Sequence, residues 1–407
     1  MEVLYPRCAG LDVHARQVTG CVRITSGSEV TYLHHTAATT TRGLLALADW
    51  LAAHGVTHVA MEATGVYWKP VWQLLEGQFT VVLANALHIR HVPGRKSDMT
   101  DAAWIADLLA HGLIRGSFVP PAAIQRLRDL TRTRKQLVRE TARHTLRIQK
   151  TLEDANVKLT HVLTDILGKS GRAILKALIA GERDPARLAG LITGRVKATH
   201  EQLTEALHGR VTDHHRFLLQ LHLTQIESLD AAIDELERHM GDALGPFQAA
   251  IALLTTMPGL SDTAARVLIA EVGDDMSRFP SPGHLVSWAG LCPRLDISAG
   301  KRRSTRIRQA TPWLKATLIQ AAWAASRKRD SYLRAQFLRL KTRRGPKKAI
   351  VAVAASMLTA VYFMLRDGVE YRDLGARYLT DRDKQQKTQR LLRQLRDLGV
   401  NVDIRAA

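Results

Sequence analysis

Four acidic residues in the first quarter of this chain constrain its fold more than any other feature. Asp12 ends a short apolar run that predicts a first β-strand, and Glu62 ends a second such run just before a turn-prone segment. Asp98 and Asp101 are three residues apart at the start of an expected helix, so both carboxylates lie on one face of that helix. Strand ends and helix starts are rigid supports, and we therefore predict that the four side chains meet in one pocket.

A pocket that gathers four carboxylates favours divalent metal ions. Without cations the charges repel one another and some of the groups protonate. Two Mg²⁺ ions about 4 Å apart, held by oxygen ligands, would form a clamp for in-line chemistry at phosphate. Taken singly, Asp12 is typical of a turn, Glu62 of a solvated loop and Asp98 of a helix cap. The order of all four along one fold favours the metal site, with Mg²⁺ as the expected cofactor.

The pattern of elements around the acids predicts an α/β domain of the RNase H-like type. Three antiparallel strands, followed by parallel strands with helical crossovers, describe this fold, and acidic residues gather at the centre of its sheet. After the strand that contains Asp12, the expected elements are strands at 17–24 and 30–35, a helix at 41–54, a strand at 57–62, a helix at 66–76 and a strand at 80–83.

The size and charge of the chain restrict its function. A length of 407 residues allows two or three domains, and 46% hydrophobic with 24% charged residues is typical of a globular protein. A net charge of +20 predicts a polyanionic partner, which by itself fits DNA, RNA, ribosomes or an anionic membrane. We find no signal-peptide pattern, the apolar run 349–365 favours a buried helix, and the three cysteines lack disulfide or zinc spacing. We therefore expect a cytoplasmic, nucleoid-associated protein.

Changes of pattern along the chain predict four regions. Pro120 and Pro121 mark the end of the α/β domain, and Gly245 with Pro246 marks the end of a helical and coiled-coil region. A second compact, mainly helical domain and a polar peripheral tail follow. The expected bounds are 1–118, 119–248, 249–372 and 373–407.

One long helix expected after Pro121 is strongly basic and contains few acids. Its cations are spread around the helix, an arrangement that suits the phosphate backbone of a nucleic acid. A solvated face is the plainer alternative, but unbalanced charge of this length repels itself. The cations are Arg126, Arg128, Arg132, Arg134, Lys135, Arg139, Arg143, Arg147 and Lys150, and the predicted nucleic-acid ligands among them are Arg126, Arg132, Arg134, Lys135, Arg139 and Arg143.

Further along, apolar residues repeat at the alternating three- and four-residue spacing of a coiled-coil seam. The sequence leaves open whether this seam pairs within the chain or between protomers. Its members are Ile226, Leu229, Ile233, Leu236 and Met240.

The C-terminal half contains two segments with possible roles at phosphate. Pro258 and Gly259 lie in a segment that looks like a helix-hairpin-helix turn, in which backbone N–H groups bind a phosphate, although any tight turn between helices has this composition. Ser298 is a candidate nucleophile because a run of cations flanks it. A serine hydroxyl is weakly nucleophilic at neutral pH and needs a base, a metal or such a cationic setting to react. A loop serine is the plainer alternative. The cations expected to offset phosphoryl charge and to bind nucleic acid there are Arg294, Lys301, Arg302, Arg303 and Arg306.

Several motifs together resemble the DEDD transposases of bacterial insertion sequences, of the insertion-sequence 110 type (IS116/IS110/IS902). They extend in the expected order over nearly the whole chain, except the C-terminal tail. The motifs are Gly10-Leu11-Asp12-Val13-His14, Met61-Glu62-Ala63-Thr64-Gly65-Val66-Tyr67-Trp68, Lys96-Ser97-Asp98-Met99-Thr100-Asp101-Ala102, Met257-Pro258-Gly259-Leu260, Ala289-Gly290-Leu291-Cys292-Pro293 and Ser298-Ala299-Gly300-Lys301.

This resemblance implies a bridge-RNA-guided recombinase. It implies a RuvC-like domain whose four acids bind Mg²⁺, at Asp12, Glu62, Asp98 and Asp101 here, and a transposase domain within 249–372. The serine of that domain, Ser298 here, would attack DNA and form a covalent phosphoserine link. Family members build their sites between protomers, in a dimer that pairs into a tetramer, and a noncoding RNA from the element specifies donor and target double-stranded DNA.

Two departures from the family pattern concern the loop around the serine. Ser298-Ala299-Gly300 replaces the more common Ser-Gly or Ser-Gly-Gly, and the segment 305–311 lacks the glycines found in many members. Ser304 is close enough to be a rival nucleophile.

We therefore expect an insertion-sequence transposase that exchanges DNA strands by phosphoryl transfer, without ATP, since the chain has no Gly-x-x-x-x-Gly-Lys loop. One alternative is a metal-dependent nuclease that resolves branched DNA with water as nucleophile, in which Ser298 only contacts a phosphate. The other is a non-catalytic nucleic-acid-binding regulator, in which the acids are structural.

Overall fold

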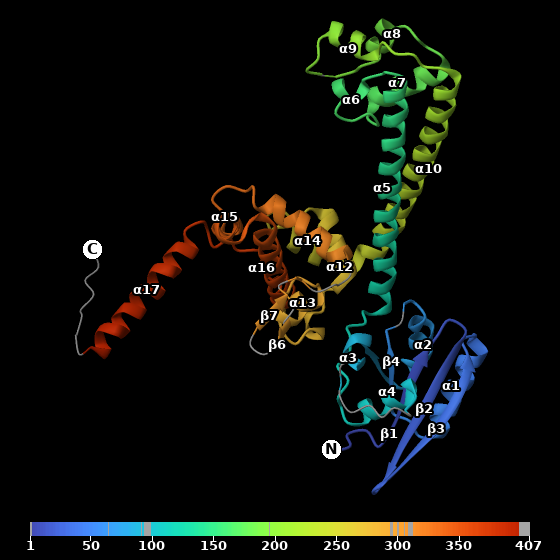
Figure 1. Cartoon of the computed structure of the whole chain (residues 1–407), viewed down its shortest axis with the longest axis vertical. Coiled ribbons are helices and arrows are strands. Elements are labelled where there is room, and N and C mark those ends of the chain that lie inside the picture. Colours follow the sequence, from blue (N-terminus) through green and yellow to red (C-terminus); the bar gives the residue numbers. More distant parts are fainter. Residues whose placement is uncertain are drawn as a thin grey trace. The chain divides into compact units, whose positions relative to one another are not determined.

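The computed structural model of the chain divides into two compact units, Met1–Val119 and Pro120–Ala407 (Figure 1). The structure describes residues 2–63, 65–90, 92, 99–194, 196–293, 296–298, 301–304, 306–307 and 312–398. Each unit has its own core, and the two are described in turn.

A five-stranded sheet forms the first unit. Its strands are β1 (Arg7–Val13), β2 (Gln17–Ser26), β3 (Glu29–Ala38), β4 (His58–Glu62) and β5 (Thr80–Ala84), in the spatial order β3-β2-β1-β4-β5. Strands β1, β2 and β3 pair antiparallel, whereas β1, β4 and β5 pair parallel. The predicted succession of antiparallel and parallel strands is confirmed, and this mixed sheet fits an RNase H-like domain.

In the described part of the first unit, four helices accompany the sheet: α1 (Thr41–Ala53), α2 (Trp68–Leu75), α3 (Ala86–Arg90) and α4 (Asp101–Ala110). Threonines begin two of them, because the Thr40 and Thr100 side chains accept hydrogen bonds from backbone N–H groups in the first turns of α1 and α4. Buried residues of α1 and α2 share one core with the sheet, and those of α4 share a second core with it. Helix α4 and helix α1 therefore serve separate cores on the sheet.

Two long helices, α5 (Ala122–Asp154) and α10 (Asp213–Leu244), lie side by side in the second unit (Figure 1). The proposed seam of α10 has Ile226 and Met240 buried and its other three members partly buried, and α10 packs along α5 of the same chain. Between them come α6 (Leu159–Val162), α7 (Lys169–Ala180), α8 (Pro185–Gly190) and α9 (His200–Leu207), which form a core with the ends of both long helices.

The rest of the second unit is mainly helical, as expected. Its elements are η1 (Gly245–Phe247), α11 (Gln248–Thr255), α12 (Asp262–Val272), η2 (Met276–Arg278), α13 (Pro282–Trp288), β6 (Asp296–Ser298), β7 (Lys301–Ser304), α14 (Pro312–Ala325), α15 (Tyr332–Arg344), α16 (Pro346–Asp367) and α17 (Tyr378–Asp397). The short hairpin β6–β7 is an addition to the sequence prediction. Helix α17 lies within the segment expected as a tail.

Helix α16 is long and apolar enough to cross a membrane. Its residues Ala349, Val353, Met357 and Val361 are fully buried, and α16 packs against α13, α14 and α15. The expectation of a buried helix in this run is confirmed.

Candidate functional site

Asp12 and Glu62 occupy the carboxyl ends of two neighbouring parallel strands and face the same side of the sheet. Leu11 on β1 pairs with Met61 on β4, and both point into the core that contains the buried face of α1. Because successive side chains of a strand alternate between faces, Asp12 and Glu62 point to the opposite face. Helix α4 covers that face, where Trp104 packs against the sheet.

A glycine allows α4 to lie directly on β1 near the acids. A Cβ atom on Gly10 would lie 2.2 Å from the carbonyl oxygen of Ala102 and 2.4 Å from the amide nitrogen of Ala106, so only glycine fits there. Asp101 is the first residue of α4 and precedes Ala102. The close approach therefore brings the helix start that contains Asp101 toward the strand end that contains Asp12.

The three described acids all reach solvent, to different degrees. The Asp12 carboxylate is 29% exposed and accepts a hydrogen bond from Nε2 of His14 at 3.1 Å. Glu62 is half-buried, and Asp101 is exposed. Beyond the end of β1 lies an open pocket of about 520 Å³, lined by Val13, His14, Ala15, Arg16, Gln17 and Tyr67. In the sequence, His14 and Tyr67 stand out only as parts of family motifs.

The chemistry of these side chains fits a hard divalent cation, because carboxylate oxygens are the ligands that such ions prefer. Asp12, Glu62 and Asp101 are placed around one edge of the sheet, whereas Asp98 lies outside the described residues. Within the described part of the chain, no three His, Cys, Asp or Glu side chains form a ready-made metal site. Ion binding at this edge stays a prediction.

The candidate nucleophile lies at the end of a β-strand in the second unit. Ser298 is the last residue of β6, and its backbone pairs with Lys301 of β7. The rival Ser304 ends β7, and its hydroxyl accepts a hydrogen bond from the backbone N–H of Arg306 at 3.2 Å.

The cations predicted around Ser298 are placed as follows. Lys301 and Arg306 are exposed, and the backbones of Arg302 and Arg303 belong to β7. Arg294 lies outside the described residues.

The Pro258–Gly259 turn joins α11 to α12 and packs tightly. Gly259 has a φ of 88°, in the region that favours glycine, and a Cβ atom there would lie 2.3 Å from the carbonyl oxygen of Ala321 on α14. Ser261 then begins α12 by accepting a hydrogen bond from the Ala264 N–H. The turn thus has a packing reason for its glycine, and phosphate binding by it stays a prediction.

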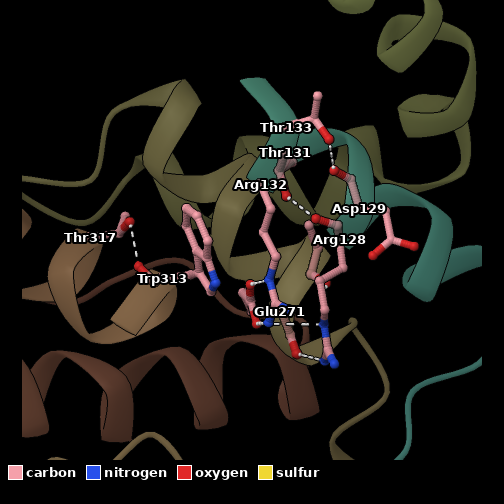
Figure 2. Close-up of polar contacts among 9 residues, drawn as sticks. Arg128, Asp129, Thr131, Arg132, Thr133, Glu271, Trp313 and Thr317 are labelled. Atoms are coloured by element: carbon pink, nitrogen blue, oxygen red, sulfur yellow. Dashed lines mark hydrogen bonds and ion pairs between the residues drawn. The ribbon is translucent and has the colours of Figure 1, made fainter. Parts of the chain in front are cut away.

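The first turns of α5 hold a buried ion pair instead of presenting all their cations to solvent (Figure 2). Arg132 donates from Nε to Oε1 of Glu271 at 2.8 Å and from Nη2 to Oε2 at 2.9 Å. Arg128 lies 3.5 Å from the same carboxylate and also donates to the backbone carbonyl of Glu271. The Glu271 side chain, on α12, is only 1% exposed, so its charge is compensated inside the protein.

Other predicted ligands on α5 differ in their surroundings. Arg134 forms an ion pair with Glu237 of α10, whereas Arg126, Arg139 and Arg143 are exposed. Sequence reasoning missed Glu271. The available signal was a single acid inside the otherwise apolar run that ends α12, since a charge in such a run needs a partner.

Two family profiles match the chain. The profile of the DEDD transposase of IS110 type matches residues 9–157, and the profile described as "Transposase IS116/IS110/IS902 family" matches residues 251–338. The chain belongs to the IS110-type transposases.

A relative of this transposase is known from Streptomyces coelicolor, where it is described as the insertion element IS110 uncharacterized 43.6 kDa protein. The two chains are 29% identical over 311 residues, which cover 69% of this chain and 73% of the relative. The enzyme class is therefore DNA transposase or recombinase, and DNA is the expected partner. A DEDD domain also suggests a divalent metal ion, and a transposase is expected to be soluble and cytoplasmic.

Proposed function

We propose that this IS110-type transposase exchanges DNA strands by phosphoryl transfer through a covalent link between Ser298 and DNA. The observation that carries the proposal is the common orientation of Asp12 and Glu62 toward the face of the sheet on which α4 begins with Asp101. Three acids at one sheet edge form a suitable support for chemistry at a phosphodiester.

The chemical roles follow from the side chains. The Ser298 oxygen forms a bond to phosphorus while the bond to one bridging oxygen of the DNA breaks, and that oxygen leaves with a proton. The new ester conserves the energy of the phosphodiester, so no ATP is needed to join the strands again. A divalent ion, Mg²⁺ by our prediction, would be held by Asp12, Glu62, Asp98 and Asp101 and supply positive charge at the phosphate.

The partners follow from charge and from family membership. A net charge of +20 suits a complex with several nucleic-acid strands. We propose that these are donor and target double-stranded DNA and a guide RNA from the same element, bound by a homodimer that pairs into a tetramer. In this proposal 1–118 is the metal-binding domain, 119–248 includes a coiled coil, 249–372 binds DNA through a helix-hairpin-helix-like turn, and 373–407 is peripheral.

The experiment that tests this function is capture of the covalent intermediate. Full-length protein with Mg²⁺, the RNA of its element and end-labelled donor DNA is denatured, and labelled protein is detected on a gel. We expect an adduct with the native chain and with Ser304→Ala, and none with Ser298→Ala. Mass spectrometry of the digested adduct should place the nucleotide on Ser298.

The alternatives predict other outcomes of the same experiment. Cleavage by Ser298→Ala without any adduct would support a nuclease that uses water, an alternative that the RNase H-like sheet makes reasonable. Binding of nucleic acid that is equally strong in Asp12→Asn, with no cleavage by either protein, would support a non-catalytic regulator.

A further inference from the structure

The ion pair of Glu271 divides the basic residues of α5 into two groups with different surroundings. Arg128 and Arg132 form ion pairs with Glu271, whose side chain is buried. The cations that follow on the same face of the helix, three or four residues apart, are Lys135, Arg139, Arg143, Arg147 and Lys150. Among the described residues none of these five has a carboxylate within ion-pair distance.

The indole ring of Trp313 lies where the two groups of cations meet. Its centroid is 5.8 Å from Arg132, 5.9 Å from Lys135 and 5.2 Å from Arg139. A cation within about 6 Å of an aromatic ring is attracted to its electron-rich face. Trp313 is itself fixed in the first turn of α14, where its carbonyl accepts a hydrogen bond from Thr317 (Figure 2).

Trp313 therefore holds Lys135 close to Arg139 in spite of their like charge. Burial lowers the pKa of Lys135, and the positive charge of Arg139 lowers it further, whereas Glu271 raises it. Like charges four residues apart also destabilise a helix. An anion bound between Lys135 and Arg139 would stabilise the charged form of Lys135 and would offset the repulsion between the two like charges.

We propose that one face of α5 binds backbone phosphates of a nucleic acid and that Trp313 positions its first two cations. This α5 phosphate face consists of Lys135, Arg139, Arg143, Arg147 and Lys150. The proposal rests on the proposed function only in taking nucleic acid as the ligand. It leaves Arg128 and Arg132 out of the binding surface, although Arg132 was predicted from sequence as a ligand.

The length of the α5 phosphate face suits a nucleic-acid strand. From Lys135 to Lys150 the helix rises about 22 Å. Phosphates of one DNA strand recur about every 3.4 Å along the duplex axis, so several of them can meet this face. Arg139, Arg143, Arg147 and Lys150 are exposed, and their long side chains can adjust to the strand.

The test is the salt dependence of binding by the full-length protein. Fluorescence anisotropy with a labelled duplex DNA and a single-stranded RNA of equal length is measured between about 50 and 200 mM salt. The variant is the double substitution Lys135→Gln, Arg139→Gln. The control is Lys176→Gln, Arg187→Gln, which removes the same charge from two ion-paired surface residues on α7 and α8. Thermal unfolding of each variant verifies that it is folded.

We expect the double variant to bind about tenfold more weakly at the middle of this range. The slope of log K against log salt should fall by about 1.8 for DNA or about 1.4 for RNA, since two phosphate contacts are lost. The control pair should leave the slope unchanged. The nucleic acid whose slope falls is the ligand of the α5 phosphate face.

The role of Trp313 is tested by a pair of substitutions. Trp313→Phe retains an aromatic face and should keep the native affinity, whereas Trp313→Ala should weaken binding several-fold with both variants folded. Unchanged slopes for both nucleic acids in the Lys135, Arg139 double variant, or equal binding by the two Trp313 variants, would overturn the proposal. Because binding needs no strand exchange, these outcomes are independent of whether Ser298 forms an adduct.

Discussion

Both units of this transposase contain carboxylates with a proposed role, but these carboxylates differ in their exposure to solvent and in the compensation of their charge. In the second unit Glu271 is closed to solvent and its charge is compensated by Arg128 and Arg132. In the first unit Asp12 and Glu62 stand at strand ends and are partly open to solvent. A buried carboxylate whose charge is compensated by cations of its own protein contributes to the fold, whereas a carboxylate that reaches solvent can also be approached by an ion from outside.

The largest effect on stability should come from the compensated carboxylate. Replacing Glu271→Ala leaves Arg128 and Arg132 poorly solvated and without a counter-charge, which should lower the free energy of unfolding by about 3–5 kcal/mol. Urea unfolding followed by tryptophan fluorescence measures this, since Trp288 and Trp313 lie near the two arginines. The control Glu237→Ala removes a partly exposed acid that is paired with Arg134 and should change stability by less than about 1 kcal/mol. Equal losses in both variants would remove the distinction.

Substitution of the solvent-accessible Asp12 should have the reverse effect, with little loss of stability and a large loss of activity. Asp12→Asn keeps the size of the side chain and removes a charge at a partly exposed site, so stability should change by less than about 0.5 kcal/mol. Strand exchange should fall by at least about a hundredfold, because the positive charge at the phosphate is no longer held. A variant that exchanges strands at the native rate would show that Asp12 is only a strand-end residue.

The contact between α4 and β1 is the next largest expected effect. Gly10→Ala places a methyl group against backbone atoms of α4, which should lower the free energy of unfolding by about 1–3 kcal/mol and displace Asp101 from Asp12. Gly77→Ala is the matched control, since a Cβ atom there meets no atom within 4 Å. If both variants unfold at the native temperature, α4 does not need its close approach to β1.

The smallest expected effect is a pH dependence between the two long helices. Burial lowers the pKa of His222, and the charges of His144 and Arg147 lower it further. Below pH about 6.5 the unfolded chain therefore binds a proton before the folded one, and stability falls as the pH falls toward the folded pKa. His222→Gln should reduce this fall, and the exposed His208→Gln should not. Identical pH profiles of all three proteins would contradict this assignment.

Local patterns predicted the first unit because its information lies in short stretches of sequence. The alternation of apolar residues marks β1 and β4, and the position of Asp12 and Glu62 at their ends follows from the same residues. Thr100 and Asp101 mark the start of α4 in the same way. Three of the four predicted acids could thus be placed at element ends from sequence alone.

In the second unit, local sequence patterns do not predict the contacts between distant segments. The partner of Arg132 is 139 residues away in sequence, and no local spacing connects it with Glu271. The sequence did not predict the hairpin of β6 and β7, because its strands are short and polar and lack the alternation that marks a half-buried strand. Pairing between distant segments depends on packing, which a single sequence does not display.

The most direct test of the central claim is metal binding by the resting full-length protein. Titration with Mn²⁺, followed by electron paramagnetic resonance of the free ion, needs neither DNA nor strand exchange. We predict saturable binding by the native chain and by Glu237→Ala, and a loss of at least about tenfold in affinity in Asp12→Asn and in Glu62→Gln. Equal affinity in all four proteins would show that the acids at the sheet edge do not form a metal site.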